Sequence, residues 1–304
     1  MKKLWLVSLA IFGCGGFGLW MVFSLIRSMP VSSTATPAPV ASPTPEPDLP
    51  QYQRFTLPNS EIHTVKIPAE SRFRVSIALS PQTDSIEQFA QSSAAIAVIN
   101  GGFFDPKNEK TMSHVIENGK QIADPEKNER LTENPNLQPY LNQILNRSEF
   151  RRYQCGEKTQ YAIVSHKTEV PSGCKLVDAI GGGPQLLPKL TSTEEGFVDP
   201  MVGRDSIGVQ QRNARSAIGI TRDGSVVLVM AAQKPEAPGN SGMSLPALAT
   251  FMEQRLDVVQ GMNLDGGSSS ALFYQGEMFY GKVDKEGQPI QRSVKSVVTV
   301  QAKE

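Results

Sequence analysis

Short segments in which apolar and polar residues alternate fill most of the chain after residue 50. Residues 61–67 and 72–79 alternate with a period of two, which predicts half-buried strands, and the apolar run 94–99 predicts a buried strand. The Asn118-Gly119 pair and the turn at 222–225 predict two hairpins. Further strands are expected at 161–165, 177–180, 217–221, 226–231, 272–274, 277–280 and 294–300.

Helical spacing is rare in the same region. A short helix is expected at 85–93 and another near 137–145. The clearest helix is expected at 244–255, where Ser244 is suited to cap the first turn. The polar stretch 124–152 is interpreted as a surface excursion that covers a site.

Three glycine-rich turns, at 101–102, 181–183 and 266–267, each follow a short apolar segment and adjoin polar side chains. Glycine permits tight turns and a close approach of the backbone to a ligand. Because functional sites are commonly built on loops held by a rigid scaffold, we expect the three turns to converge at one end of a mixed sheet. A nucleotide P-loop is excluded at 181–183, since no Gly-Lys-Ser/Thr follows and Pro184 lacks an N–H group.

The stretch 261–272, GMNLDGGSSSAL, carries the strongest chemical signal. Its carboxylate, Asp265, is suited to act as a general acid or base, a nucleophile or a ligand of a hard metal ion. The serines that follow offer hydroxyl and N–H groups to a ligand. Asp, Gly and Ser are also the usual turn residues, so the alternative is a capped turn without chemistry.

Two further signals are weaker. The motif NGGFFD at 100–105 supplies Asn100 and Asp105 as polar groups beside flexible backbone, and the alternative is a strand-ending turn anchored by its phenylalanines. Arg215 begins a predicted strand, where a guanidinium could hold a phosphate or carboxylate by two parallel hydrogen bonds. A lone arginine is more often a surface charge.

The N-terminal residues differ in composition from the rest. An uncharged run from Leu4 to Ile26 follows two lysines and is long enough to span a bilayer as a helix. We expect residues 1–27 to be an uncleaved membrane anchor that places the rest of the chain outside the cytoplasm, in the periplasm or at the cell surface. A cleaved signal peptide or a lipoprotein signal around Cys14 are the alternatives.

Residues 28–50 are rich in Pro, Ser, Thr and Ala and cannot bury enough apolar surface to fold, so they predict an extended linker. The folded domain is expected to comprise residues 51–304. Its two cysteines, Cys155 and Cys174, predict a disulfide in an extracytoplasmic protein, with two unlinked thiols as the alternative.

Net charge adds one exclusion. The 30 basic and 30 acidic residues give a formal charge of +0, so no overall field points to nucleic acid as a partner. The membrane, through the anchor, remains an expected partner.

Five motifs follow one another in a recognisable order: NGGFF at 100–104, GGGPQLL at 181–187, RSAIG at 215–219, SGMSL at 241–245 and NLDGGSSS at 263–270. In order and spacing they resemble the phosphodiester glycosidase domain, over roughly residues 70–302. The resemblance implies an α+β fold with a mixed, mostly antiparallel sheet, few helices and a cleft formed by glycine-rich loops. It also implies hydrolysis of a sugar-1-phosphodiester to a sugar and a phosphomonoester.

The family resemblance assigns roles to the motif residues. Asp265 is expected to be the base or nucleophile, and Arg215, with the N–H groups of the 181–183 loop, is expected to stabilise phosphate charge. Asn100 and Asp105 are expected to bind sugar hydroxyls or a metal. The residues expected to contact substrate are Gly101, Gly102, Phe103, Asp105, Gly181, Gly182, Gly183, Gly266, Gly267, Ser268 and Ser269.

Three points stay open at this stage. The sequence requires no cofactor, but Asp265, Asp105 and Asn100 are oxygen ligands that would suit Ca²⁺ or Mg²⁺. His114 is a weaker choice as second acid or base, for which a surface or structural role is the alternative. The family usually reads Asp-Gly-Gly-Gly-Ser-Ser where this chain has Ser268 in place of the third glycine, which puts the substrate in doubt.

A second function from another class fits the same features. The domain could be a non-catalytic envelope module that binds glycans and supports exopolysaccharide or cell-wall assembly. The anchor and linker suit either function, and fold alone does not decide between them. Glycan binding without turnover, surviving the loss of Asp265, would favour the binding module.

Overall fold

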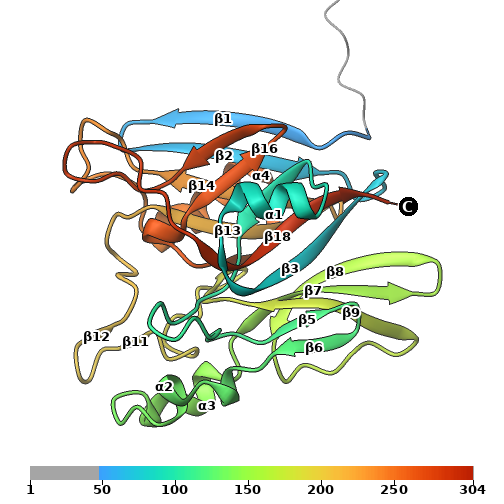
Figure 1. The fold of residues 1–304 in the computed structure, drawn as a ribbon, viewed down its shortest axis with the longest axis horizontal. Helices are drawn as coiled ribbons and strands as arrows, with labels where there is room; N and C mark the ends of the chain where they lie inside the picture. Colours follow the sequence, from blue (N-terminus) through green and yellow to red (C-terminus); the bar gives the residue numbers. More distant parts are fainter. Residues whose placement is uncertain (1–47, 304) are drawn as a thin grey trace, which may run out of the picture. The chain divides into compact units, whose positions relative to one another are not determined.

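The computed structural model describes residues 48–303. These residues form one compact unit, built mainly from three antiparallel sheets and few helices (Figure 1). The largest sheet has the strand order β1 (Gln51–Leu57), β2 (Ser60–Ile67), β14 (Val226–Ala232), β13 (Arg215–Thr221), β15 (Val258–Asn263) and β10 (Gln185–Leu187).

The other two sheets have five strands each. The second has the order β17 (Glu277–Tyr280), β16 (Ala271–Tyr274), β4 (Ala97–Asn100), β18 (Val294–Ala302) and β3 (Phe73–Asp84). The third has the order β6 (Lys120–Ala123), β5 (Val115–Glu117), β9 (Cys174–Gly181), β7 (Ser148–Cys155) and β8 (Lys158–Ser165). A short pair, β11 (Val198–Asp199) and β12 (Arg204–Asp205), lies outside them.

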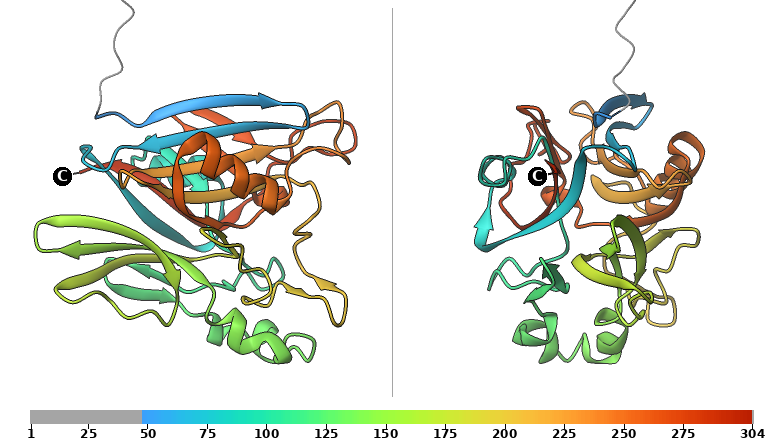
Figure 2. Two further views of the ribbon diagram at one scale, coloured as in Figure 1. Left: turned by 180° about the vertical axis from the view of Figure 1, so that it is seen from behind. Right: turned by 90° about the vertical axis from the view of Figure 1, so that its right-hand side faces the viewer.

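The helices are short, and one packs on the six-stranded sheet while another packs on the second sheet (Figure 2). The helix α1 (Ile86–Ser92) is capped by Ser85, and α4 (Leu245–Leu256) by Ser244, whose hydroxyl accepts from the N–H of Ala247. The remaining turns are η1 (Pro125–Lys127), α2 (Glu129–Thr132), η2 (Gln138–Tyr140), α3 (Leu141–Ile144) and η3 (Gly267–Ser269).

The main core lies where all three sheets meet. Val65 of β2, Ile99 of β4 and Ile180 of β9 belong to one buried apolar cluster. A second cluster joins the far face of the six-stranded sheet to α4, and a third joins the second sheet to α1. The strands are thus fixed on both faces, and their ends become rigid supports for the loops that follow them.

The α+β architecture with mostly antiparallel strands is confirmed, and every strand pair in residues 48–303 is antiparallel. The 222–225 hairpin, the Asn118-Gly119 hairpin and the helices near 85–93 and 244–255 are also confirmed. The short strands β1, β10, β11 and β12 were not predicted, and neither were β7 and β15.

Strand β7 shows why part of the polar excursion was wrongly placed on the surface. Glu149 and Arg151 are 1% and 3% exposed and form an ion pair, with Arg151 Nε 2.8 Å from Glu149 Oε2. Arg151 also donates to the carbonyl of Thr168 at 2.7 Å. Buried charges need such partners, and a sequence pattern does not reveal them.

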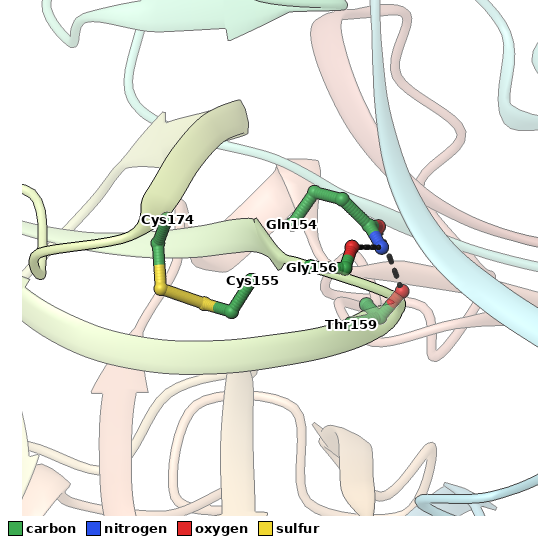
Figure 3. The surroundings of a disulfide bond; sticks show 5 residues. All are labelled: Gln154, Cys155, Gly156, Thr159 and Cys174. Carbon is green, nitrogen blue, oxygen red and sulfur yellow. Dashed lines mark hydrogen bonds between the residues drawn. A yellow bond between two sulfur atoms is a disulfide. The ribbon is translucent and has the colours of Figure 1, made fainter.

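Cys155 and Cys174 form a disulfide between β7 and β9 (Figure 3). The two cysteines face each other directly in the strand register. A loop of this size adds about 3 kcal/mol to the free energy of unfolding by loop-entropy reasoning.

The predicted anchor at residues 1–27 and most of the predicted linker lie outside the described residues. Between residues 48 and 303, no helix is both long and apolar enough to cross a membrane. The first strand, β1, begins at Gln51 and follows Pro50, whose carbonyl accepts a hydrogen bond from Tyr274 Oη at 2.9 Å.

Candidate active site

The three glycine-rich turns meet at the ends of β4, β9 and β15. The N–H of Asp265 donates to the carbonyl of Gly101 at 3.0 Å, which joins the first turn to the third. The N–H of Gly183 donates to the carbonyl of Asn263 at 2.8 Å, which joins the second to the third. These bonds bring together segments far apart in the sequence, as expected from the turns.

Gly102 and Gly183 are required by this close approach. A Cβ atom on Gly102 would lie 2.2 Å from the carbonyl oxygen of Gly181. Gly183 has a φ of +101°, and a Cβ there would lie 2.2 Å from Glu195 Oε2. A larger residue at Gly102 would push the first two turns apart, and one at Gly183 would displace the Glu195 side chain and strain the backbone.

Asp265 is the carboxylate at the junction. Its Oδ1 accepts the N–H of Gly266 at 2.9 Å, and the side chain is half-buried. Burial raises the pKa of Asp265 from 3.8 to about 6, although nearby Ser269, the positive charge of Arg292 and the Gly266 N–H oppose the shift. A carboxyl with a pKa close to neutrality is suited to give and take protons.

Serine hydroxyls surround this carboxylate. Ser269 and Ser270 are 1% and 0% exposed, and within residues 48–303 neither hydroxyl has a hydrogen-bond partner of normal geometry. Buried polar atoms without partners are rare in folded proteins and call for a ligand or a functional reason. Ser268, in contrast, accepts a hydrogen bond from Arg292 Nη1 at 2.9 Å.

Arg292 lies beside this turn and was not singled out in the sequence. It lies in the loop before β18, is half-buried, and its guanidinium carbon lies 5.0 Å from the ring centroid of Phe104. Its charge acts on Asp265 and its Nη1 donates to Ser268. No local motif marks this arginine, because only the fold brings residue 292 to the turn at 266–267.

The expected role of Asn100 is corrected by its contacts. The side chain is 0% exposed, and its Nδ2 donates to the carbonyl of Asp265 at 2.7 Å. Its Oδ1 accepts from Ser216 Oγ at 2.6 Å and from the N–H of Ala271 at 3.2 Å. Both ends of the amide are occupied, so Asn100 positions Asp265 instead of touching a sugar hydroxyl or a metal.

Arg215 is also engaged internally, contrary to the expectation that it holds phosphate. It is 3% exposed, and its guanidinium donates to the carbonyls of Met243, Ile207, Gly208 and Gln211 at 2.6–3.1 Å. Burial lowers the pKa of Arg215 to about 10. It therefore fixes the 207–211 loop against the start of α4.

The N–H groups of the 181–183 loop have acceptors as well. Gly181, Gly182 and Gly183 donate to the carbonyls of His114, Ser148 and Asn263 at 2.8–2.9 Å. These groups cannot bind phosphate without losing a backbone bond. The loop supports the site through its shape, and Arg292 is the cation that remains beside Asp265.

Comparison with known proteins assigns a family to this geometry. A model of the phosphodiester glycosidase family matches residues 93–301. The chain belongs to the phosphodiester glycosidase family.

Three solved structures share the fold of this phosphodiester glycosidase. A hypothetical protein from Synechocystis has a TM-score of 0.54 at 18% identity, over 83% of this chain and 61% of the other. The catalytic domain of zebrafish N-acetylglucosamine-1-phosphodiester alpha-N-acetylglucosaminidase has a TM-score of 0.58 at 17% identity, over 83% and 82%. A protein from Burkholderia pseudomallei has a TM-score of 0.55 at 15% identity, over 79% and 74%.

Sequence comparison with curated proteins gave no significant match. This phosphodiester glycosidase spans 61% of the length of the Synechocystis protein. At these identities the solved structures establish a common fold, and the substrate has to be argued from the residues of this chain.

In this phosphodiester glycosidase, Asp105 does not join Asp265. Its Oδ1 accepts the N–H of Lys107 at 2.8 Å, and its Oδ2 pairs with Arg130 Nε at 2.6 Å. With Asn100 also occupied, the three oxygen donors expected for Ca²⁺ or Mg²⁺ do not fit a common ion. Within residues 48–303, no group of three His, Cys, Asp or Glu side chains converges on a metal position.

His114 has a structural role in the third sheet. Its ring stacks on His166 with centroids 3.6 Å apart, and its Nε2 lies 3.3 Å from the carbonyl of Leu145. Burial and the neighbouring His166 lower the pKa of His114. Its carbonyl accepts the N–H of Gly181, so His114 supports the second glycine turn without facing Asp265.

Phe103 lines a pocket of about 230 Å³ beside the first glycine turn. Its ring centroid lies 5.7 Å from that of Phe197. Leu137 and Ile144, from the polar excursion, complete the wall. A larger hollow of about 720 Å³, between β1 and the end of α4, includes none of the motif residues, whereas one of about 390 Å³ is lined by Gly242, Met243 and Ser244 of the fourth motif.

Proposed function

We propose that this enzyme hydrolyses a sugar-1-phosphodiester in the cell envelope, releasing the free sugar and a phosphomonoester. The observation that carries the proposal is the proximity of Asp265, whose pKa is raised to about 6, to the cation Arg292, which donates to Ser268 in the turn that follows Asp265. A base and a cation side by side suit a reaction in which water is activated and an oxyanion departs.

The reaction is attack at the anomeric carbon. Water bonds to that carbon while the bond from carbon to the phosphate oxygen breaks. The electron pair leaves with the phosphate, and the proton of the attacking water passes to Asp265. Because a phosphate is a good leaving group, no strong general acid is needed, unlike in ordinary glycosidases.

Arg292 is assigned to the departing phosphate. Its half-buried guanidinium can offer paired N–H donors to two phosphate oxygens, and its position near Asp265 favours the ionised base. Ser268, the serine of this turn that is not fully buried, is assigned to a sugar hydroxyl.

An extracytoplasmic location is part of the proposal. The disulfide between Cys155 and Cys174 suits an oxidising compartment. The uncharged run at residues 4–26 and the proline-rich segment after it suit a membrane anchor followed by a linker. Fractionation of cells that express the full chain, with protease added outside, tests this point.

The deciding experiment is turnover of a panel of sugar-1-phosphodiesters by the purified chain in water enriched in oxygen-18. Attack at the anomeric carbon places the label in the released sugar, and attack at phosphorus places it in the phosphomonoester. Label in the phosphomonoester overturns the mechanism. Binding of these compounds without turnover, retained in Asp265→Ala, supports a glycan-binding module instead.

A further inference from the structure

The pocket that Phe103 lines contains two arginines that no part of the proposed mechanism uses. Its wall is otherwise apolar and aromatic, formed by Phe103, Phe104, Met112, Leu137, Ile144, Phe197 and Ile207, with Ser206. Arg147 and Arg204 are the charged residues of this lining, and no carboxylate belongs to it. A small apolar pocket with two cations is an unusual arrangement unless an anion enters it.

Arg147 is held rigidly but is not neutralised. It is 8% exposed, its Nε donates to the carbonyl of Glu195 at 3.1 Å, and its guanidinium carbon lies 3.6 Å from the ring centroid of Phe197. Within residues 48–303, its two Nη groups have no hydrogen-bond acceptor, yet neither is fully enclosed. They therefore remain accessible from the pocket. Burial lowers the pKa of Arg147 to about 9, although the charge of nearby Glu195 opposes the shift.

Arg204 is held by the same two kinds of contact as Arg147, a hydrogen bond from Nε to a backbone carbonyl and an aromatic ring beside the guanidinium. Its Nε donates to the carbonyl of Gly196 at 3.2 Å, and its guanidinium carbon lies 4.5 Å from the ring centroid of Tyr140. The side chain is half-buried, and the charges of Arg204 and Arg147 repel each other enough to lower the pKa of Arg147 further. Two stacked guanidinium groups with free N–H donors form a preorganised receptor for an oxyanion.

The nearest carboxylates are bound elsewhere. Glu195 accepts hydrogen bonds from Ser148, Thr191 and the N–H of Gln185. Asp199 accepts from Tyr140 Oη at 2.8 Å and from the N–H of Met201 at 3.0 Å. Neither lies within 4 Å of a guanidinium nitrogen of Arg147 or Arg204, so no ion pair neutralises them.

The geometry points to this pocket as a subsite for a second phosphate group on the aglycone side of the substrate. Phe104 links it to the reaction centre, since this ring lines the pocket and also lies under Arg292. The pocket holds about 230 Å³, below the roughly 300–1,000 Å³ of whole-ligand sites, so it accepts one group of a larger substrate. The aromatic walls suit an apolar or ring-shaped body attached to that phosphate.

This inference rests on the proposed function for its kinetic consequence, but the binding site can be tested without turnover. The first measurement is calorimetric titration with inorganic pyrophosphate of the purified chain carrying Arg292→Gln, which removes the cation beside Asp265. Binding should persist in this background and weaken about tenfold or more when Arg204→Gln or Arg147→Met is added. Arg212→Gln, at an exposed arginine outside the pocket, is the matched control and should change nothing.

Arg204→Gln keeps the test valid if Arg147→Met fails to fold, because Arg204 is half-buried and lies outside the core. Equal pyrophosphate affinity with and without Arg204→Gln, in a protein with unchanged melting temperature, would overturn the anion subsite. Turnover has no part in this outcome, so it separates failure of the subsite from failure of the proposed function.

The second measurement compares two substrates that share the same sugar-1-phosphate, one with a neutral alcohol as aglycone and one with an aglycone that carries a further phosphate. Arg204→Gln should raise KM for the doubly charged substrate about tenfold and leave KM for the neutral one unchanged. An equal rise for both would show that the pocket holds the scissile phosphate, which overturns the assignment to a second group.

Discussion

The surroundings of Asp265 and of Arg215 lie side by side and satisfy their polar groups in opposite ways. A Cβ on Gly266, next to Asp265, would lie 3.9 Å from Arg215 Cδ, so the two regions are in contact. Around Arg215, four N–H donors meet four backbone carbonyls. Around Asp265, the hydroxyls of Ser269 and Ser270 have no partner, and burial opposes the charge of the carboxylate.

The Arg215 region is therefore expected to contribute to the stability of the fold, and the adjacent Asp265 region to the reaction. A fully bonded buried cation stabilises the fold because removing it leaves its acceptors without donors. Groups that stay unsatisfied weaken the fold and are available to a substrate. We therefore expect substitutions in the two regions to affect different measurements.

The largest effect is expected for Asp265→Asn. Turnover should fall about 10⁴-fold, because an amide can act neither as base nor as nucleophile. The melting temperature should stay the same or rise at pH 7, since the cost of ionising a buried carboxyl disappears. Near wild-type turnover of the variant on the same substrate would contradict the assignment of Asp265.

Arg292→Gln should have the next largest effect. Loss of the cation beside the leaving group is expected to lower kcat about 10²–10³-fold, as for other groups that stabilise developing negative charge. Arg292→Lys keeps the charge but not the paired donors and should recover part of the loss. Steady-state kinetics on one sugar-1-phosphodiester measure both, and an unchanged kcat in Arg292→Gln would remove Arg292 from the mechanism.

Arg215→Gln should lower stability more than turnover, the opposite of the two substitutions above. Four carbonyls lose their donors, so the free energy of unfolding should fall by about 2–4 kcal/mol and the melting temperature by roughly 10 °C. Below that temperature, kcat should change far less than in Arg292→Gln. Arg212→Gln, at an exposed arginine, serves as control for the loss of one charge. A kcat loss as large as that of Arg292→Gln, without loss of stability, would restore Arg215 as a phosphate ligand.

The pH dependence should expose Asp265 in both kinetics and stability. Because the base must be ionised, kcat/KM should fall about tenfold per pH unit below about pH 6. The folded-state pKa lies above the unfolded value of 3.8, so the stabilisation from protonated Asp265 is complete below pH 3.8 and lost as pH rises through about 6. By pH 7 this costs up to about 3 kcal/mol. Melting curves of wild type and Asp265→Asn should therefore diverge between pH 4 and 7, and parallel curves would refute the raised pKa.

The smallest effect is expected from removal of metal. Asp105 and Asn100 are occupied by Arg130 and by backbone groups, so dialysis against EDTA should leave the melting temperature and turnover unchanged. Loss of turnover that Ca²⁺ or Mg²⁺ restores would show that these contacts rearrange to admit an ion.

The sequence predicted the fold class and the meeting of the glycine turns, because both follow from local patterns. Alternation marks strands, and glycine marks the positions where Gly102 and Gly181 come too close for a side chain. The roles of Arg215 and Asn100 could not be predicted, since the same residue types suit a ligand or a buried support. Only the hydrogen-bond partners decide between these functions.

Arg292 and Arg147 were missed for a related reason. Neither belongs to a motif, and each reaches its place through contacts with residues distant in sequence, Phe104 and Phe197. The burial of strand β7 was not predicted because it contains the charged residues Glu149 and Arg151. These two side chains form an ion pair inside the protein. The pattern of polar and apolar residues in the sequence gives the type of each residue, but it does not give the residue with which a side chain forms a hydrogen bond or an ion pair.

The disulfide has a consequence for alignment in the third sheet. It joins Cys155 and Cys174 at one end of β7 and β9, while the other end pairs Glu149 with Gly181 at the second glycine turn. The pairing shifts between Arg152 and Tyr153, so these strands have an irregular register. A slip by one residue would exchange the two faces of β7 and carry Glu149 and Arg151 together out of their buried position. The disulfide prevents this misalignment of β7 and β9. The two cysteines thereby help to hold the second glycine turn in position, although they lie at the opposite end of the strands.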